Sequence, residues 1–141
     1  MKPYLQNHLA TSEGRSELGW HILRLTLASL IAAHGWVRFI GGGVVPFGEW
    51  LGSEGLPMGF LIAASVTAVE ILGTLFLAAR RFVLSLCVIY TFIYSAGITL
   101  VHSKAGWFVV GLGRNGVEYS VLIIVALLCI GLQHIKPGNP A

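Results

Sequence analysis

Residues 57–79 read PMGFLIAASVTAVEILGTLFLAA and carry a single charged side chain, that of Glu70. About 20 apolar residues in a helix are long enough to cross the hydrocarbon core of a bilayer. Hydrocarbon offers the backbone no hydrogen-bond partner, so such a stretch satisfies its own backbone bonds most simply as a helix. Pro57 suits a first helical position, and the basic pair Arg80-Arg81 follows the stretch. The stretch therefore predicts a membrane-spanning helix that ends in a tight basic turn.

Three more apolar stretches of similar length lie at about residues 18–39, 82–102 and 117–135. The whole chain of 141 residues is 55% hydrophobic and 11% charged, whereas soluble domains are about a quarter charged. A closed β-barrel would need strands of about ten alternating residues instead of these unbroken runs. We therefore expect an all-α integral membrane protein, a four-helix bundle with up-down-up-down topology over residues 18–135 and a short tail at 136–141.

The segments before and between the first two spans are polar or rich in glycine. Residues 1–17 predict a polar tail or surface segment, in which Thr11 or Ser12 could cap a helical turn. The three glycines at 41–43 are expected to end the first helix. The segment that follows them, up to Leu56, is long enough to fold over the bundle as a cap.

The basic residues in the short connections predict the orientation of the bundle, because cytoplasmic loops carry an excess of Lys and Arg. More of these residues fall on one expected side of the membrane than on the other. Those on the first side are Lys2, Arg15, Arg80, Arg81 and Lys136, and those on the second are Arg38, Lys104 and Arg114. The excess predicts that both termini are cytoplasmic, in what we expect to be a bacterial inner membrane.

Net charge and cysteine usage exclude some classes of function. The formal charge of +3 comes from basic residues spread along the chain, without the clustered basic and aromatic patch that nucleic acid binding needs. Cys87 and Cys129 both fall in apolar runs, with no C-x-x-C spacing and no metal-ligand pattern around them. We expect them to be packing residues, with a buried redox pair as the alternative, and we expect neither a nucleic acid partner nor a metal site.

Two charged residues lie deep in the first two spans. A charged side chain at the bilayer centre costs about 2.5–3.5 kcal/mol, so it usually faces the bundle interior and has a partner. Arg24 lies about six residues from the expected inner end of its span and Glu70 about nine from that of the next, a mismatch of roughly 5 Å along the helix axis. The spacing predicts an intramembrane ion pair between Arg24 and Glu70, which could equally serve only to lock the two helices together.

A second set of polar residues is expected near the outer face. His34 and Arg38 are one turn apart on the first span and share a face. His102 closes the third span at the same level, and Asn115 and Glu118 open the fourth. Separate chain segments thus place titratable or hydrogen-bonding groups at one depth. We predict a ligand-binding or proton-exchange site at these five residues, although a single histidine at such a place would more often be structural.

Residues 111–116, GLGRNG, match the pattern G-x-G-x-x-G of dinucleotide-binding proteins. That pattern binds a dinucleotide where it follows a strand and opens a helix in a βαβ unit, whereas here it lies between two apolar spans. We expect it instead to form a tight connection that brings Asn115 and Glu118 over the mouth of the bundle. Glu118 would then lie in the first turn of its helix, where a carboxylate is favoured.

Four features of the sequence form a recognisable pattern: R-x(10)-G from Arg24 to Gly35, E-x-x-G from Glu70 to Gly73, His102, and N-G-x-E-Y from Asn115 to Tyr119. With this pattern the chain resembles the DoxX family of small four-helix membrane proteins, over nearly its whole length from about 18 to 132. One difference is Arg38, which keeps the charge of the lysine typical of the family but changes the hydrogen-bond geometry.

This resemblance implies a membrane protein loosely assigned to redox chemistry, sometimes as a partner of soluble oxidoreductases; relatives include a subunit of thiosulfate:quinone oxidoreductase. Our first hypothesis is a redox-associated subunit, not catalytic by itself, that holds a quinone or a small sulfur-containing anion at the outer layer. Arg38 and Arg114 would attract negative charge. His102 or Glu118 would exchange protons, since histidine titrates near neutrality.

Other functions are compatible with the same sequence. The chain has no flavin motif and no iron–sulfur cysteines, so we expect no intrinsic cofactor, and a b-type haem between His34 and His102 is an alternative that we favour less. A second class is a non-catalytic accessory or structural subunit of a larger membrane complex. A small transporter is the weakest alternative, because four spans make a narrow pathway and no inverted repeat is evident. The expected partners are the lipid bilayer and other protein subunits.

Overall fold

A computed structural model of the chain describes residues 10–110 and 115–135, and every regular element in these ranges is helical. The expected all-α class is confirmed for this part of the chain. The predicted tail residues 1–9 and 136–141, and residues 111–114 of the GLGRNG motif with Arg114, lie outside the described ranges. The elements are α2 (Ser12–Ile40), α3 (Val44–Ser53), α4 (Gly59–Ala68), the π-helix η1 (Val69–Gly73), α5 (Thr74–Ala78), α6 (Val83–Leu100), the 3₁₀-helix η2 (His102–Ala105) and α7 (Glu118–Leu132).

Three of these helical stretches are long and apolar enough to cross a membrane. They are α2 with 29 residues, the continuous α4–η1–α5 with 20 and α6 with 18, and their mean hydropathies are 1.2, 2.1 and 1.9. The fourth apolar helix, α7, has 15 residues, which is about 22 Å of helix against the roughly 30 Å of a hydrocarbon core. The fourth expected span, 117–135, is thus helical over a shorter length than the sequence predicts.

The first helix begins earlier than the expected span at residue 18. Thr11 caps it, because its Oγ1 accepts a hydrogen bond from the Gly14 backbone N–H at 3.1 Å. Glu13 lies in the first turn, where the helix dipole favours a carboxylate. The last part of the expected polar tail is therefore the first turns of α2.

The connections follow the glycines and the basic pair. The turn at 41–43 ends α2, as expected, and α3 then folds back against the start of α4. A Cβ placed on Gly48 would lie 2.6 Å from Phe60 Cα, so only glycine permits this approach. The expectation for Pro57 is wrong, because the left-handed Met58 (φ 58°) separates it from α4. The turn between α5 and α6 closes at Arg81, whose N–H donates to Phe76 O at 2.8 Å.

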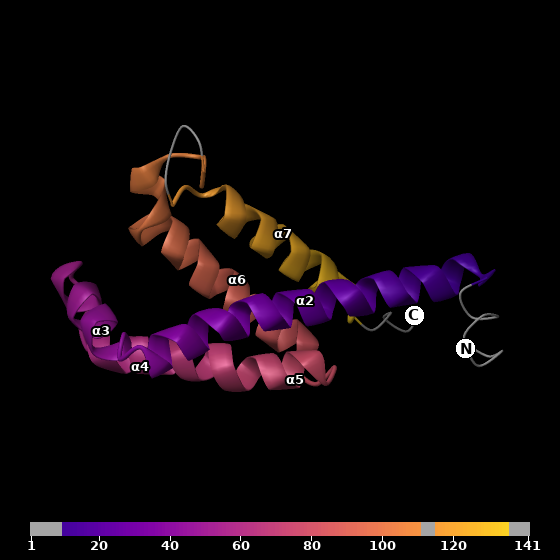
Figure 1. Cartoon of the computed structure of the whole chain (residues 1–141), viewed down its shortest axis with the longest axis horizontal. Helices are drawn as coiled ribbons and strands as arrows, with labels where there is room; N and C mark the ends of the chain where they lie inside the picture. The colour runs from indigo at the N-terminus through magenta and orange to yellow at the C-terminus, as the bar shows by residue number, and fades with distance from the viewer. Residues whose placement is uncertain (1–9, 111–114, 136–141) are drawn as a thin grey trace, which may run out of the picture.

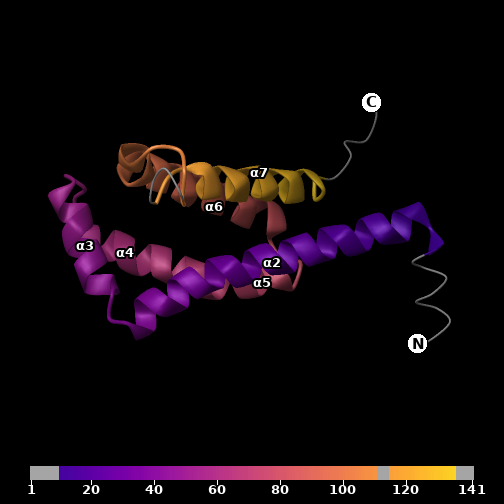
Figure 2. The same cartoon turned by 45° about the horizontal axis from the view of Figure 1, so that its top comes forward.

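The helices form two pairs that lie on one another (Figures 1 and 2). In the first pair α2 runs beside α4–η1–α5, and in the second α6 runs beside α7, while α3 lies across one end. We call the end with the start of α2, the α5–α6 turn and the end of α7 the terminal end. The opposite end, with the end of α2, α3 and residues 101–117, is the loop end.

The core lies where the two pairs meet, in the middle and towards the terminal end. Tyr90, Ile31, Leu77 and Leu127 have no exposed surface there. Cys87 belongs to this core, Cys129 is half-buried, and neither forms a disulfide. The full set of buried apolar residues is Leu27, Ala28, Ile31, Leu77, Val83, Leu86, Cys87, Tyr90, Ile123, Leu127 and Ile130.

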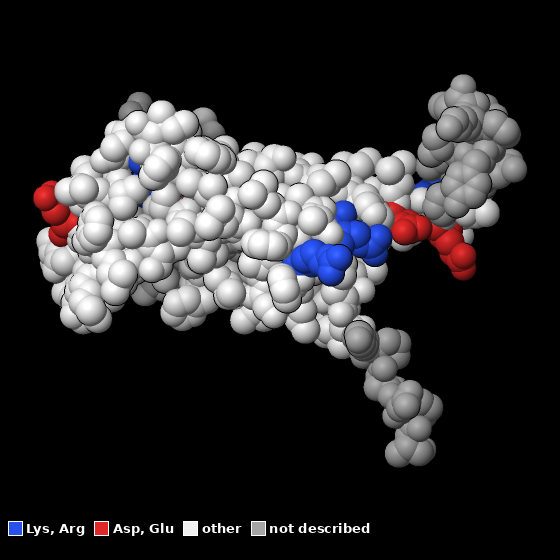
Figure 3. Space-filling model, turned by 90° about the horizontal axis from the view of Figure 1, so that it is seen from below, with Lys and Arg blue, Asp and Glu red and all other residues white. Residues whose placement is uncertain are grey.

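Most of the apolar surface of the three long helices faces outward. Only 28%, 33% and 22% of the residues in their apolar windows are buried. Figure 3 shows that the charged side chains on one face lie in two groups with uncharged surface between them. Soluble monomers rarely expose a continuous apolar surface of this extent. Together with the three long helices, this surface indicates a membrane protein.

Candidate functional site

A buried ion pair joins the first helix pair at the loop end. Arg38 Nη1 lies 2.6 Å from Glu70 Oε2, and the Glu70 side chain is 5% exposed. The same nitrogen donates to Thr67 Oγ1 at 3.2 Å. The Arg38 guanidinium also lies over the ring of Phe47 from α3, 4.7 Å from the ring centroid. Arg38 thus connects α2 with the second apolar stretch and with α3.

Close packing of α2 against η1 sets the position of this pair. A Cβ placed on Gly35 would lie 2.9 Å from both Glu70 Cβ and Ile71 Cγ1. Gly35 is therefore level with Glu70, and Arg38 follows it by three residues on the same helix face. The R-x(10)-G pattern ends at this glycine, and the glycine brings Arg38 rather than Arg24 to the carboxylate.

The expected ion pair between Arg24 and Glu70 is wrong. Arg24 Nη1 donates instead to the carbonyl oxygens of Leu77 and Ala78, each at 3.1 Å. Leu77 is seven residues beyond Glu70, or about 10 Å along the helix. The expected depth of Arg24 was counted from residue 18 as the inner end of the helix, whereas α2 begins earlier, at Ser12.

Glu70 lies in a turn of π-helix in the middle of the second apolar stretch. Tyr90 Oη donates to the Val69 carbonyl at 2.9 Å, and Thr74 Oγ1 donates to the Glu70 carbonyl at 2.8 Å. Single π turns inside α-helices occur frequently at functional sites. The sequence did not predict this turn; the combination of Glu70 with Gly73 and Thr74 is the nearest signal that it contains.

The two predicted histidines lie near the ion pair on different elements. His34 is exposed on α2 and lies close enough to Arg38 and His102 to interact electrostatically with both. It lines a shallow hollow of about 350 Å³ with Ala33, Val37 and Arg38. His102 Nδ1 lies 2.8 Å from the Asn115 carbonyl oxygen, so this nitrogen donates and Nε2 remains for another partner.

The other two predicted residues hold the connection before α7. Asn115 has a left-handed backbone (φ 60°), and its carbonyl rather than its side chain contacts His102. Glu118 Oε1 accepts the Val109 N–H at 2.9 Å, and its own N–H donates to Trp107 O. His34 thus lies near Arg38 and His102, and His102 bonds the Asn115 carbonyl, whereas Glu118 bonds the backbone of the loop.

Tyr94 is a half-buried residue of α6. Its Oη is buried and has no hydrogen-bond partner in the described part of the chain. Electrostatic interactions connect it with Glu70, Arg38 and Tyr119. An unpaired buried hydroxyl costs about 1–3 kcal/mol, so a group that accepts or donates a hydrogen bond here would remove that cost.

An apolar hollow of about 630 Å³ lies beside the ion pair, between the end of α2, the start of α3 and α4. Trp36, Phe39, Phe60 and Ile71 are among its lining residues, and Thr67 is one of its few polar groups. Thr67 also accepts the hydrogen bond from Arg38. The hollow therefore reaches the buried charge through one hydroxyl group.

Within residues 10–110 and 115–135, no three His, Cys, Asp or Glu side chains are arranged to hold a metal ion. A haem held by two histidines would have to use His34 and His102. The ligand atom of His102 would be Nε2, because Nδ1 bonds the Asn115 carbonyl oxygen. No family model matches the chain, and no curated protein or solved structure matches it significantly.

Proposed function

We propose that the chain is a four-span membrane bundle of the DoxX type that binds a quinone, or a small sulfur-containing anion, at the loop end and works with a partner oxidoreductase. Its place would be a bacterial inner membrane, with both termini in the cytoplasm. The bound molecule would lie against Arg38, and the partner would supply or accept the electrons, since the sequence carries no flavin motif or iron–sulfur cysteines.

The observation that carries this proposal is that Thr67, which lines the apolar hollow, accepts a hydrogen bond from Arg38 of the buried ion pair. A quinone combines a large apolar body with carbonyl oxygens that accept hydrogen bonds. Binding pockets for such ligands are mostly apolar, with a few polar groups that fix orientation, in volumes of roughly 300–1,000 Å³. The hollow of about 630 Å³ is lined mostly by apolar residues, with Thr67 as a polar group that also bonds Arg38 behind it.

Proton exchange at the site would fall to the histidines. Reduction of a quinone to a quinol takes up two electrons and two protons. His34 is exposed beside Arg38, and His102 has one ring nitrogen open, so either could pass a proton between solvent and ligand. A sulfur-containing anion would instead use the guanidinium of Arg38, whose fork suits oxyanions.

Mass spectrometry of the chain purified in mild detergent tests the proposal, under native conditions and after organic extraction. Removing Arg38 alone would leave the Glu70 carboxylate buried without its partner, so the binding variant combines Arg38→Met with Glu70→Gln. Lys104→Ala is the matched control, because Lys104 pairs with Glu54 at the same end but outside the hollow. A quinone or anion retained by the parent and the control but lost from the double variant supports binding at this site.

A second candidate is the accessory subunit, and two observations favour it. Arg38 and Glu70 satisfy each other without a ligand. Trp107, Phe108 and Val110 expose 54%, 45% and 78% of their surface beyond the end of α6, which suits contact with a partner subunit. A parent chain that leaves native membranes with stoichiometric protein partners and no small molecule would favour this candidate over the first.

A further inference from the structure

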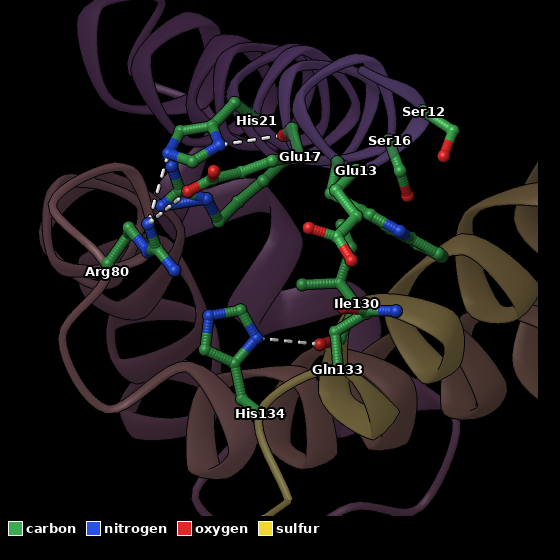
Figure 4. A pocket seen from close by; sticks show the side chains of 11 residues that line it. Ser12, Glu13, Ser16, Glu17, His21, Arg80, Ile130, Gln133 and His134 are labelled. Carbon is green, nitrogen blue, oxygen red and sulfur yellow. Dashed lines mark hydrogen bonds and ion pairs between the residues drawn. The ribbon is translucent and has the colours of Figure 1, made fainter. Parts of the chain in front are cut away.

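A polar cavity of about 500 Å³ opens at the terminal end (Figure 4). It lies between the first turns of α2, the α5–α6 turn and the end of α7. Trp20, His21 and Arg24 line it from α2, Arg80 from the turn, and His134 from beyond α7. None of these residues belongs to the site proposed above.

Arg24 is a buried cation whose hydrogen bonds within the described residues go to backbone oxygens. It is 4% exposed, and its printed hydrogen bonds go from Nη1 to two backbone carbonyls. Among the described residues, no carboxylate forms an ion pair with it. A buried charge usually has a counter-charge as well as hydrogen bonds, because its desolvation is costly. The remaining guanidinium nitrogens of Arg24 are thus available to an anionic group in the cavity.

Arg80 adds a second positive charge to the same space. It lies close enough to Arg24 for the two charges to repel each other. Arg80 Nη1 lies 3.2 Å from His21 Nε2 and 3.8 Å from Glu17 Oε1. The His21 ring in turn donates from Nδ1 to the Glu17 carbonyl. An anion bound between Arg24 and Arg80 would attract both guanidinium groups and offset their mutual repulsion.

The opposite side of the cavity offers acceptors. Glu13 points into it from the first turn of α2 (Figure 4), and the described residues give it no ion-pair partner. His134 donates from Nδ1 to the Ile130 carbonyl at 2.9 Å, so its neutral Nε2 is an acceptor. That Nε2 is buried and has no partner in the described part of the chain. The cavity therefore has Arg24 and Arg80 on one side, with the Glu17 carboxylate beside Arg80, and the acceptors Glu13 and His134 on the other.

We propose that this cavity binds an aminophosphate group, the head group of an ethanolamine phospholipid or a free phosphate ester of the same amine. The phosphate lies between Arg24 and Arg80, whose planar guanidinium groups match phosphate geometry. The ammonium group lies beside Glu13. Trp20, half-buried at this end of the apolar surface, is the type of residue that favours the depth of lipid head groups.

Native mass spectrometry of the full chain in nanodiscs tests the lipid source. The nanodiscs contain equal amounts of phosphatidylethanolamine, phosphatidylglycerol and phosphatidylcholine, and the lipid released with the protein is counted. Calorimetric titration of the detergent-purified chain with glycerophosphoethanolamine tests the free source, with inorganic phosphate as the comparison probe. The variants are Arg80→Ala, Glu13→Gln and Arg24→Met. The control is Arg81→Ala, which removes a neighbouring charge that does not line the cavity.

We expect Arg80→Ala and Arg24→Met to weaken binding by about tenfold or more, since each removes a charged hydrogen-bond donor. Glu13→Gln should abolish the preference for the ethanolamine group over phosphatidylglycerol and inorganic phosphate, while Arg81→Ala changes neither. If Arg24→Met fails to fold, Arg80→Ala beside Arg81→Ala still decides the question, because both residues are exposed in the same turn. No binding of either probe overturns the proposal, and so do equal losses in Arg80→Ala and Arg81→Ala.

Discussion

Gly35 and Glu70 are in direct contact across the first helix pair, with room for no side chain between them: a Cβ on Gly35 would lie 2.9 Å from Glu70 Cβ. This contact fixes the register of α2 against the second apolar stretch. It places Arg38, rather than Arg24, opposite the carboxylate. Which arginine pairs with Glu70 therefore depends on Gly35, which carries no charge itself.

Gly35→Ala should destabilise the protein, because the new methyl group meets Glu70 Cβ and Ile71 Cγ1. Overpacking of this kind costs about 1–3 kcal/mol, measured as a lower midpoint of thermal unfolding in detergent. Gly19→Ala, on the same helix with nothing within 4 Å, is the matched control. It should be slightly more stable than the parent, by about 0.5–1 kcal/mol. Equal effects of the two substitutions would show that α2 does not approach η1 this closely.

Arg38→Ala should lower the free energy of unfolding by about 3–5 kcal/mol, because it leaves a buried carboxylate without its partner. The double variant Arg38→Met, Glu70→Gln should recover much of that loss, since neither charge then remains. Lys104→Ala, which breaks the exposed pair with Glu54, should cost less than about 1 kcal/mol. A double-mutant cycle of Arg38→Met, Glu70→Gln and the two together, measured by unfolding in detergent, gives the coupling energy; a cycle with no coupling between Arg38 and Glu70 would contradict the ion pair.

Tyr90→Phe and Tyr94→Phe should have different effects although both remove one hydroxyl group from α6. The Tyr90 hydroxyl donates to the Val69 carbonyl at the π turn, so its loss should cost about 1 kcal/mol. The Tyr94 hydroxyl has no partner among the described residues, so Tyr94→Phe should be neutral or stabilising. Should the proposed ligand accept a hydrogen bond from Tyr94, the same variant retains less of it. Equal destabilisation by both substitutions would refute this assignment.

Cysteine labelling tests the proposed membrane orientation. In a chain with Cys87 and Cys129 replaced by serine, Arg81→Cys should react with a membrane-impermeant maleimide only from the cytoplasmic side. Lys104→Cys, at the loop end, should react only from the other side. The two positions lie at opposite ends of α6. Labelling of both from one side would show that α6 does not cross the membrane.

The helical class and most of the boundaries were predictable because local chemistry decides them. The glycines at 41–43 end α2, Thr11 caps it, and the basic pair at 80–81 forms the second turn. Each of these depends on a few adjacent residues and on the apolar runs between them. Pro57 was misleading because the left-handed Met58 intervenes before α4 begins.

The partner of Glu70 could not be predicted from distances to helix ends. The register depends on where α2 and the second stretch touch, and that is the place where Gly35 has no side chain. The π turn was also unpredictable, because the hydroxyl that bonds its Val69 carbonyl comes from Tyr90 on another helix. Local pattern thus gives the elements, and the contacts between distant residues decide which charges meet.

The position of the core makes it a hinge between the two helix pairs. Within the described residues, the buried apolar side chains of α6 and α7 lie between Val83 and Tyr90 and between Ile123 and Ile130, away from the loop end. The two helix pairs are joined at this core. Beyond it, the salt bridge of Lys104 with Glu54 crosses between them at the surface, and such exposed pairs hold weakly. A small rotation about the core would therefore change the separation of the two helix pairs most at the loop end, where His34 lies on α2 and His102 on η2.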